Sequence, residues 1–509
     1  MLDLPILNNH ILSAIIFLPL AGAFILLFLR NETVIRYFTL LVMLFDFALA
    51  IPLICTFDRT VRGMQFVERY EWIPSLGARY YLGIDGISVL FVFLTTLIGW
   101  ICVLASWRAI EKKVKEFMIA LLFIQSAMLG VFSALDVLLF FISWEFVFIP
   151  MYAMIAIWGG ENRVYATVKF FVYTVVGSIF MLIGVVALYK AGGTFDMPQL
   201  MVKGFPFSFQ VFAFVFFFIA FAIKVPMFPF HTWLPFAHVE APTAGSIILA
   251  AILLKMGTYG FLRFPLSMFP DASRFLATPV VILSIIAIIY GALLALSQSD
   301  MKKLVAYSSV SHMGFVTMGL FLMNKNGIEG GILQMFNHGI TTGALFLCVG
   351  IIYERTHTRD LRRYGWAAKA VPFYAFFLLI FTLASMGFPG TNGFIGELLI
   401  LIGAYQSHKI YLVFLITGIM LGAAYMLWMY KRISFGAGRH DEHQNEHYNE
   451  AGHGGHGEEE HAISDINFRE VVAVSVLLIF VFWIGFQPMS FLNIMDGSVS
   501  QIISRLGGR

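Results

Sequence analysis

The sequence predicts an all-α polytopic membrane protein of about 14 transmembrane helices, with two inverted five-helix repeats that each contain a broken helix. Three observations predict this fold: the composition, the length of the apolar runs, and two runs that are too long for one crossing. Hydrophobic residues occupy 59% of the 509 positions and charged residues only 12%, about half the charged share of an average soluble domain. So few charges cannot cover the surface of a soluble protein of this size.

The apolar runs are long enough to cross a bilayer, which takes about 20 residues per helix. The expected spans cover residues 11–29, 36–56, 83–105, 116–133, 135–157, 165–189, 207–230, 243–262, 276–297, 303–323, 329–352, 371–403, 410–430 and 469–490. The connections are short, except for residues 57–80 and the hydrophilic stretch 431–468. The N-terminal segment has no basic region and no clear cleavage site, so we expect a retained helix rather than a removed signal peptide.

Two apolar stretches are too long for a single crossing. Residues 205–238 would form a continuous helix of about 51 Å, against a hydrocarbon core of about 30 Å, and residues 370–405 are slightly longer. Both stretches contain helix breakers, namely Pro226, Pro229 and Pro235 in the first and Pro389, Gly390 and Gly393 in the second. Interrupted helices at corresponding places in two halves indicate inverted repeats around an ion site near the membrane midplane.

These features divide the chain into five parts. We expect N-terminal helices in residues 1–113, a first repeat in 114–265, a second repeat in 275–430, a polar His-rich loop in 431–468 and a C-terminal helix in 469–509. Basic residues in alternate connections number 19 on one side and 12 on the other, so the positive-inside rule places both termini outside. We expect the chain in the cell inner (plasma) membrane, with both termini periplasmic.

Two further basic residues, Lys224 and Lys255, lie inside apolar spans. An ionisable group at the bilayer centre costs several kcal/mol unless it faces water, a partner or the interior of the helix bundle. Six titratable residues lie near the middle of spans: Glu145, Lys224, Lys255, His312, His338 and Glu397. One such residue alone is more often structural, but six of them in five or six spans indicate a path for protons.

Other polar residues in the spans have simpler expected roles. Hydroxyls that can hold ordered water flank the two histidines, and they belong to Ser308, Ser309, Ser311, Thr341 and Thr342. Asp46 has no titratable neighbour in the sequence, so we expect a structural role for it. Lys169 lies near the end of a span, from which its long side chain can reach the membrane interface.

Several kinds of function are excluded by what the sequence lacks. The only cysteines, Cys55, Cys102 and Cys348, lie in separate apolar runs, which excludes a Cys-ligated iron–sulfur cluster with its about four clustered thiolates. No Walker A sequence is present, and the net charge of +3 is too small to indicate a nucleic-acid partner. Residues 452–457 match G-x-G-x-x-G, but no strand precedes them, so they do not predict a dinucleotide site.

The stretch 439–461 is a low-complexity polar segment with six histidines: His440, His443, His447, His453, His456 and His461. We expect a solvated loop, with weak metal binding as the alternative.

Five stretches of the sequence resemble the antiporter-like membrane subunits of respiratory complex I, an NADH–quinone oxidoreductase. They are YYLGIDGISVLFVFLTTLI, FISWEFVFIPMY, KVPMFPFHTWLPFAHVEAPTAGSIILAAILLK, KKLVAYSSVSHMGF and GFPGTNGFIGE. The resemblance covers the third to the thirteenth span, and residues 224–255 are its most specific part. Glu397 favours the chain M type, because the L and N types and most Mrp subunits carry Lys there. The His-rich insert departs from the family pattern, and the long C-terminal lateral helix of the L type is missing.

The resemblance implies a half-channel lysine at Lys224 with Glu145 as its partner, and a central axis of Lys255, His312 and His338 that leads to Glu397. It implies no cofactor in this chain, and partners in the L-type, N-type and small K-, J- and A-type subunits as well as the lipid bilayer. The alternative is a subunit of a multisubunit cation/proton (Mrp-type) antiporter or of a membrane-bound hydrogenase complex. A spacer that conducts no protons is a third interpretation, against which the six buried titratable residues argue.

Overall fold

The computed structural model describes residues 10–435 and 463–507 and confirms the all-α polytopic fold. Within those residues, 12 helices are long and apolar enough to cross a membrane. Two shorter apolar helices, Ile11–Leu26 and Pro372–Ser385, lie at further expected spans. The His-rich stretch 439–461, including the G-x-G-x-x-G match, lies outside the described residues.

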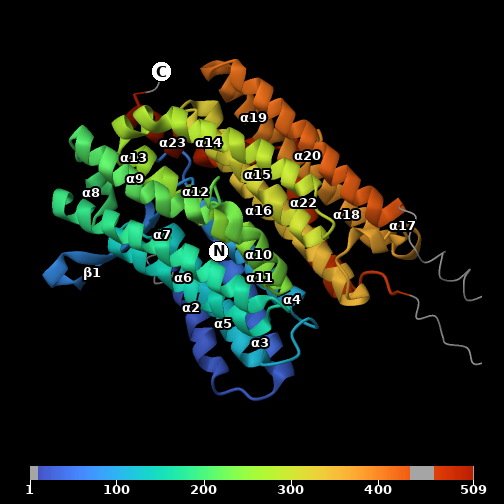
Figure 1. The fold of residues 1–509 in the computed structure, drawn as a ribbon. Coiled ribbons are helices and arrows are strands. Elements are labelled where there is room, and N and C mark those ends of the chain that lie inside the picture. The colour runs from blue at the N-terminus through green and yellow to red at the C-terminus, as the bar shows by residue number, and fades with distance from the viewer. Residues whose placement is uncertain (1–9, 436–462, 508–509) are drawn as a thin grey trace, which may run out of the picture.

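Twelve continuous or nearly continuous helical segments make up most of the bundle (Figure 1). They are α3 (Glu32–Cys55), α4 (Ser88–Ala105), α5 (Val114–Ser133), α6 (Val137–Trp158), α7 (Arg163–Gly192), α9 (Phe207–Lys224), α11 (Thr243–Ile248) with η3 (Leu249–Leu253) and α12 (Leu254–Arg263), α14 (Pro270–Leu296), α15 (Met301–Phe321), α16 (Lys325–Thr356), α20 (Ile410–Phe435) and α22 (Phe468–Phe486). Among the described residues the chain begins with α2 (Ile11–Leu26). Short helices lie in connections: α8 (Met197–Val202), α13 (Pro265–Met268), η4 (Leu361–Arg363) and α17 (Ala367–Ala370).

Both predicted helix interruptions are present. Helix α9 ends at Lys224, and after a turn the chain continues through η2 (Phe230–Thr232) into α10 (Trp233–Glu240). Helix α18 (Pro372–Ser385) ends before a turn in which Gly387 and Gly390 have φ of +72° and +90°, and α19 (Asn392–Ser407) follows. Proline lacks a backbone donor and glycine tolerates positive φ, so both turns follow from the residues in them.

Two matching backbone contacts support the predicted repeats. Asp136, which caps α6 by accepting from Leu138 N and Leu139 N, forms an isolated antiparallel bridge with Asp196. Asp300 caps α15 in the same way and bridges to Asp360. The two bridges have the same sequence separation and lie at corresponding places in the predicted repeats. The repeat boundaries themselves remain predictions.

Three features differ from the sequence-based expectations or add to them. The sequence marked the connection 57–80 only by its length, and the structure shows that it contributes most of an antiparallel hairpin of β1 (Gln65–Ile73) and β2 (Ala78–Ile84), with η1 (Pro74–Leu76) between the strands. The third span was expected from residue 83, but its helix begins at Ser88 because β2 extends to Ile84. The last expected span is followed by one more helix, α23 (Met489–Arg505), whose residues Phe491 and Met495 are buried.

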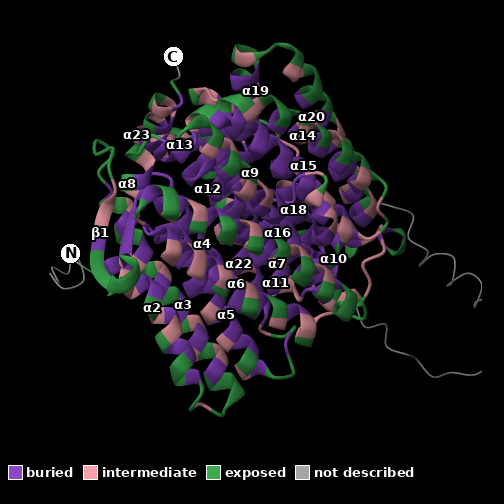
Figure 2. Cartoon of the chain, turned by 60° about the vertical axis from the view of Figure 1, so that its left-hand side comes forward, coloured by how far each residue is buried: buried purple, intermediate pink, exposed green. Residues whose placement is uncertain are grey.

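The most deeply buried helices lie in the centre of the bundle (Figure 2). The segment Thr243–Met268 and helix α16 are buried throughout their apolar windows, and α15 is nearly so. Helices α3, α7 and α20 expose most of their apolar windows, which fits surfaces that face lipid or partner subunits. The helices that carry Lys255, His312 and His338 therefore form the interior of the protein.

Candidate proton-transfer site

Lys255 lies at the centre of the bundle, in the first turn of α12, and its side chain is fully buried. The preceding residues Leu249–Leu253 form a π-helical turn, a distortion that is frequent at functional sites. The Lys255 Nζ donates a hydrogen bond to the Ala250 carbonyl oxygen and lies 2.6 Å from His338 Nδ1. A buried amine thus contacts an imidazole directly, which is the arrangement that proton exchange requires.

The two predicted histidines and Glu397 continue from this contact. His338 on α16 and His312 on α15 lie with ring centroids 5.8 Å apart and ring planes at 64°. His312 Nδ1 lies 3.8 Å from Glu397 Oε1, on α19 just after the second interruption, and both side chains are less than a tenth exposed. Lys255, His338, His312 and Glu397 therefore form one buried row, which we call the central row.

The order of the central row differs from the sequence-based expectation. That expectation followed chain order, with His312 directly after Lys255, but the structure places His338 between Lys255 and His312. The reason is packing: α16 contacts both the π-helical turn before Lys255 and helix α15. Chain order carries no information about which helix lies between two others.

Polar side chains surround the far end of the central row. His312 Nε2 lies 3.4 Å from the hydroxyl oxygens of both Ser385 and Tyr425. Close packing holds Glu397 in place, because a Cβ on Gly387 would lie 2.3 Å from its Oε2. The serines that were expected to hold water instead donate to backbone: Ser308 and Ser309 to Val305, and Ser311 to Ile288. Their hydroxyl hydrogens are therefore already engaged in this structure.

Glu145 and Lys224 stand apart from the central row. Lys224 is the last residue of α9 and is 3% exposed, with Nζ 5.3 Å from the ring centroid of Trp144. Neither Lys224 Nζ nor Glu145 Oε1 has a hydrogen-bond partner among the described residues. Glu145 lies on α6 and Lys224 at the end of α9, and the structure contains no ion pair between them within 4 Å.

Asp46, which was expected to be structural, accepts a hydrogen bond of 2.5 Å from Gln125 Nε2 and is fully buried. The Lys169 side chain is half-buried, with Nζ 4.1 Å from the ring centroid of Phe236. Neither residue touches the central row in the contacts that the structure shows.

Sequence reasoning missed a buried ion pair. Arg263 directly follows the expected span 243–262, a position typical of a basic residue in a loop, yet its side chain is 5% exposed and pairs with Asp85. Arg263 Nη1 donates to Asp85 Oδ2 at 2.8 Å, Nη2 donates to Asp85 Oδ1, and Nη2 also donates to Ser88 Oγ at 2.9 Å. This pair fastens the start of α4 to the last turn of α12, the helix that carries Lys255.

Sequence reasoning also missed His238 on α10. Its side chain is fully buried, and neither ring nitrogen has a hydrogen-bond partner within the part of the chain that the structure describes. The residue stands inside the interrupted stretch 205–238, so a search for every titratable residue in that stretch would have found it.

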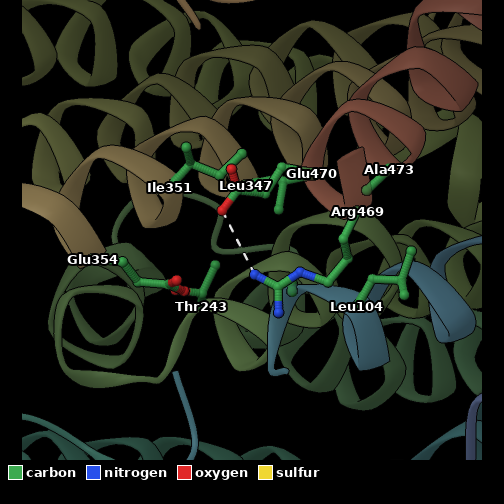
Figure 3. A pocket seen from close by; sticks show the side chains of 9 residues that line it. Leu104, Thr243, Leu347, Ile351, Glu354, Arg469, Glu470 and Ala473 are labelled. Carbon is green, nitrogen blue, oxygen red and sulfur yellow. Dashed lines mark ion pairs between the residues drawn. The ribbon is translucent and has the colours of Figure 1, made fainter. Parts of the chain in front are cut away.

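A large polar cavity opens at the end of the bundle that carries residues 108–112. Its volume is about 1360 Å³. Glu240, Lys302 and Asp360 line it, and hydrogen bonds from Arg362 hold the pKa of the Asp360 carboxyl below its ordinary value. A narrow pocket, which shares Thr243, Glu354 and Glu470 with the cavity, is lined on one side by Arg469 (Figure 3). Among the described residues, no group of three or more His, Cys, Asp or Glu side chains could hold a metal ion.

A family model described as NADH:quinone oxidoreductase/Mrp antiporter, transmembrane, matches residues 134–422, more than half of the chain. The chain belongs to this family. The matched part contains all six predicted site residues. The chain is 47% identical to the NADH-quinone oxidoreductase subunit M of Rhodobacter capsulatus, over 84% of this chain and 87% of the relative. It is 41% identical to subunit M of Rickettsia bellii, over 99% of both chains.

Solved structures agree with these relatives. A chain of respiratory complex I from Thermus thermophilus is 28% identical, with a TM-score of 0.85 over 97% of this chain and 99% of that chain. A chain of the Mrp complex from Dietzia sp. is 19% identical with a TM-score of 0.81, so it shares the fold alone. The predicted resemblance to the chain M type is confirmed. This family member is a multi-pass membrane subunit of an NADH–quinone oxidoreductase, and the Mrp-type and hydrogenase alternatives are not favoured.

Proposed function

We propose that this subunit moves protons across the membrane through the central row, driven by quinone reduction elsewhere in the complex. The observation that carries the proposal is the buried contact of 2.6 Å between Lys255 Nζ and His338 Nδ1, continued through His312 to Glu397. Ionisable groups in this position are costly, and they mark ion and proton pathways in membrane proteins. Apolar side chains would fill the same space without that cost.

The chemistry of the row requires only proton exchange. A protonated Lys255 donates to the lone pair on His338 Nδ1, and transfer along this hydrogen bond leaves a neutral amine beside an imidazolium. His338 Nε2, which has no partner in this structure, then releases its proton toward the His312 ring. From His312, Nδ1 faces the Glu397 carboxylate, which accepts the proton. The two histidines thus lie between the amine of Lys255 at one end of the row and the carboxylate of Glu397 at the other.

Glu145 and Lys224 are proposed to control the row. When Glu145 approaches Lys224, the carboxylate stabilises the lysine cation, and when the two separate, burial favours release of its proton. In the structure, Lys224 Nζ and Glu145 Oε1 have no hydrogen-bond partner among the described residues, so the separated state is compatible with the packing of the two side chains. A distant redox event would need only to shift this pairing, and the proton released from Lys224 would then join the central row.

The finer assignments belong to the same proposal. We place the subunit in the cell inner (plasma) membrane with both termini periplasmic, so that the polar cavity opens toward the cytoplasm. Its neighbours are the L-type and N-type antiporter-like subunits and small K-, J- and A-type subunits. The redox chemistry occurs in other subunits, and this chain carries no cofactor. The inverted repeats occupy residues 114–265 and 275–430.

Replacement of Lys255 tests the proposal. Lys255→Ala should abolish most proton pumping and lower NADH–quinone reductase activity with it, because a blocked proton step in a coupled complex holds back the redox step. Lys169→Ala, which removes a half-buried amine near the beginning of α7, is the matched control and should leave both activities unchanged. Wild-type pumping in Lys255→Ala vesicles with normal subunit levels would remove Lys255 from the path.

A further inference from the structure

The last transmembrane helix, α22, lies outside both predicted repeats, yet it packs along the second interrupted helix. It contacts α18 and α19, the two halves of that helix, and it also contacts α16. Arg355 near the end of α16 fastens the beginning of α22, because its Nη2 donates to Asp465 O at 3.1 Å and to Glu470 Oε2 at 2.6 Å. Helix α22 is therefore held firmly against the bundle beside the second interruption.

Asp465, which precedes α22, caps the first half of the interrupted helix. Phe373 N donates to Asp465 Oδ2 at 2.9 Å, and Tyr374 N donates to Asp465 Oδ1 at 3.0 Å. These are the first free backbone donors of α18, because Pro372 has no N–H and the residue before it, Val371, makes no side-chain cap. A carboxylate in this position satisfies the donors and interacts favourably with the helix dipole. The segment that leads into α22 therefore fixes the beginning of α18.

Gly485, at the other end of α22, contacts the turn between α18 and α19. A Cβ on Gly485 would lie 2.2 Å from Gly390 O and 2.9 Å from Thr391 C, so the backbone of α22 touches the backbone of the turn directly. Any side chain at position 485 would have to push this turn away from α22, by about 1 Å to reach an ordinary van der Waals separation. The close approach therefore requires glycine at this position.

The same turn also contacts Glu397, since a Cβ on Gly387 would lie 2.3 Å from Glu397 Oε2. Glu397 follows five residues after Asn392, the first residue of α19. Asn392 is held on α16, because Asn337 Nδ2 donates to Asn392 O at 2.7 Å. The beginning of α19 is thus held by both α16 and α22. The distance of 3.8 Å between Glu397 Oε1 and His312 Nδ1 depends on these two contacts.

We propose that α22 holds the second interrupted helix in place and thereby sets the distance between Glu397 and His312, with Gly485 as a positioning residue and Asp465 as the anchor of α18. This inference rests on the proposed function, because it concerns the last step of the central row. Gly485 acts through the backbone of the turn and takes up no proton itself. The two groups of the last step are already slightly further apart than a hydrogen bond, and a misplacement of about 1 Å can cost about a hundredfold in rate.

The test is Gly485→Ala in the intact complex. Alanine favours a helix more than glycine does, so a loss of function would come from the contact with the turn and not from a weaker α22. NADH-driven proton uptake is followed in inside-out membrane vesicles with a pH-sensitive dye, at subunit levels matched by immunoblot. We expect the rate to fall about tenfold or more. The control is Gly497→Ala on α23, where the nearest atom to the added Cβ would lie 3.7 Å away, and this variant should pump like wild type.

The structure of the Gly485→Ala complex, determined by electron cryomicroscopy, measures the position of Glu397 directly. We expect the distance between Glu397 and His312 to change by about 1 Å, the displacement that the added methyl group requires, while the rest of the subunit keeps its fold. An unchanged distance would overturn the inference, whatever the pumping rate. A displaced Glu397 with wild-type pumping would support the role of α22 and would instead count against Glu397 in the proposed function.

Two variants of Asp465 test the other end of α22, and they also decide the matter if Gly485→Ala fails to assemble. Asp465→Asn can still accept from the backbone N–H groups of α18 and should keep most of the pumping, because Asn and Asp are equally good caps. Asp465→Ala leaves those donors without their partner and should lower pumping several-fold at matched subunit levels. Wild-type pumping in Asp465→Ala, or an equal loss in both variants, would show that capping by Asp465 does not position the interrupted helix.

Discussion

Replacement of Asp85 should destabilise the subunit, because Asp85 is the only carboxylate within 4 Å of the buried Arg263 guanidinium among the described residues. Removal of one partner from a buried ion pair costs about 3–5 kcal/mol, since the other charge remains without compensation. Asn in place of Asp85 keeps the shape and can still accept from Ser88 N, which Asp85 does at 2.9 Å. We therefore expect Asp85→Asn to cost about 3 kcal/mol, or roughly a hundredfold in the equilibrium for local opening.

The matched control is Asp271→Asn, the same chemical change in an exposed ion pair. Asp271 and Arg274 are about half exposed, and exposed pairs are worth about 0–1 kcal/mol. A double variant, Asp85→Leu with Arg263→Met, removes both charges and should be more stable than Asp85→Asn alone, because apolar replacements of a buried pair are often neutral or stabilising.

The assay is the rate at which the native subunit is lost on heating the detergent-purified complex, followed by limited proteolysis and immunoblot. A rate is the proper measure, since a large membrane complex does not unfold in two states. Asp85→Asn should be lost much faster than wild type, and Asp271→Asn at the wild-type rate. Equal rates for the two variants would refute the reasoning that Arg263 depends on Asp85.

Three other predictions concern the remaining parts of the subunit. Glu145→Ala and Lys224→Ala should each abolish most pumping, and Glu145→Asp should keep part of it. The double mutant should be little worse than either single variant, because members of one unit are not additive. Pumping is measured in vesicles with matched subunit levels, and multiplicative losses would show that the two residues do not act as a pair. Gly387→Ala should displace the Glu397 side chain and lower pumping, because the added Cβ would lie 2.3 Å from Glu397 Oε2 and Gly387 has a φ of +72°. Unchanged pumping with normal assembly would show that the position of Glu397 is not critical. Deletion of residues 440–461, which are rich in His, Glu and Gly, should leave assembly and NADH-driven pumping nearly intact, because a segment of this composition buries little apolar surface. Loss of pumping with normal assembly would instead favour metal binding by the histidines.

The spans and the two interruptions could be predicted because they depend on local chemistry. Twenty apolar residues in a row have few other stable arrangements in a bilayer, since every backbone group must be bonded within the segment. The turns after Lys224 and Ser385 follow from Pro226 and from the positive φ at Gly387 and Gly390. The six titratable residues were found for the same reason, because a charge within an apolar run is visible without knowledge of its neighbours.

The contacts between helices could not be predicted from one sequence. Asp85 and Arg263 are 178 residues apart, and Arg263 at the end of an apolar run has the same local pattern as a loop residue. The position of His338 between Lys255 and His312 depends on how α16 packs. Whether Glu145 meets Lys224 depends on side-chain conformations that composition does not determine. Helix α23 was missed because Asn493, Asp496 and Ser498 interrupt its apolar residues, so it does not resemble a transmembrane span.

The most direct test of the central row is a double-mutant cycle across the contact of 2.6 Å between Lys255 and His338. Proton pumping per NADH oxidised is measured in vesicles that contain Lys255→Ala, His338→Ala, both changes or neither, at matched subunit levels. If the two residues belong to one path, the double variant should pump no worse than Lys255→Ala alone, because members of one unit are not additive. Multiplicative losses, or wild-type pumping in either single variant, would contradict the account.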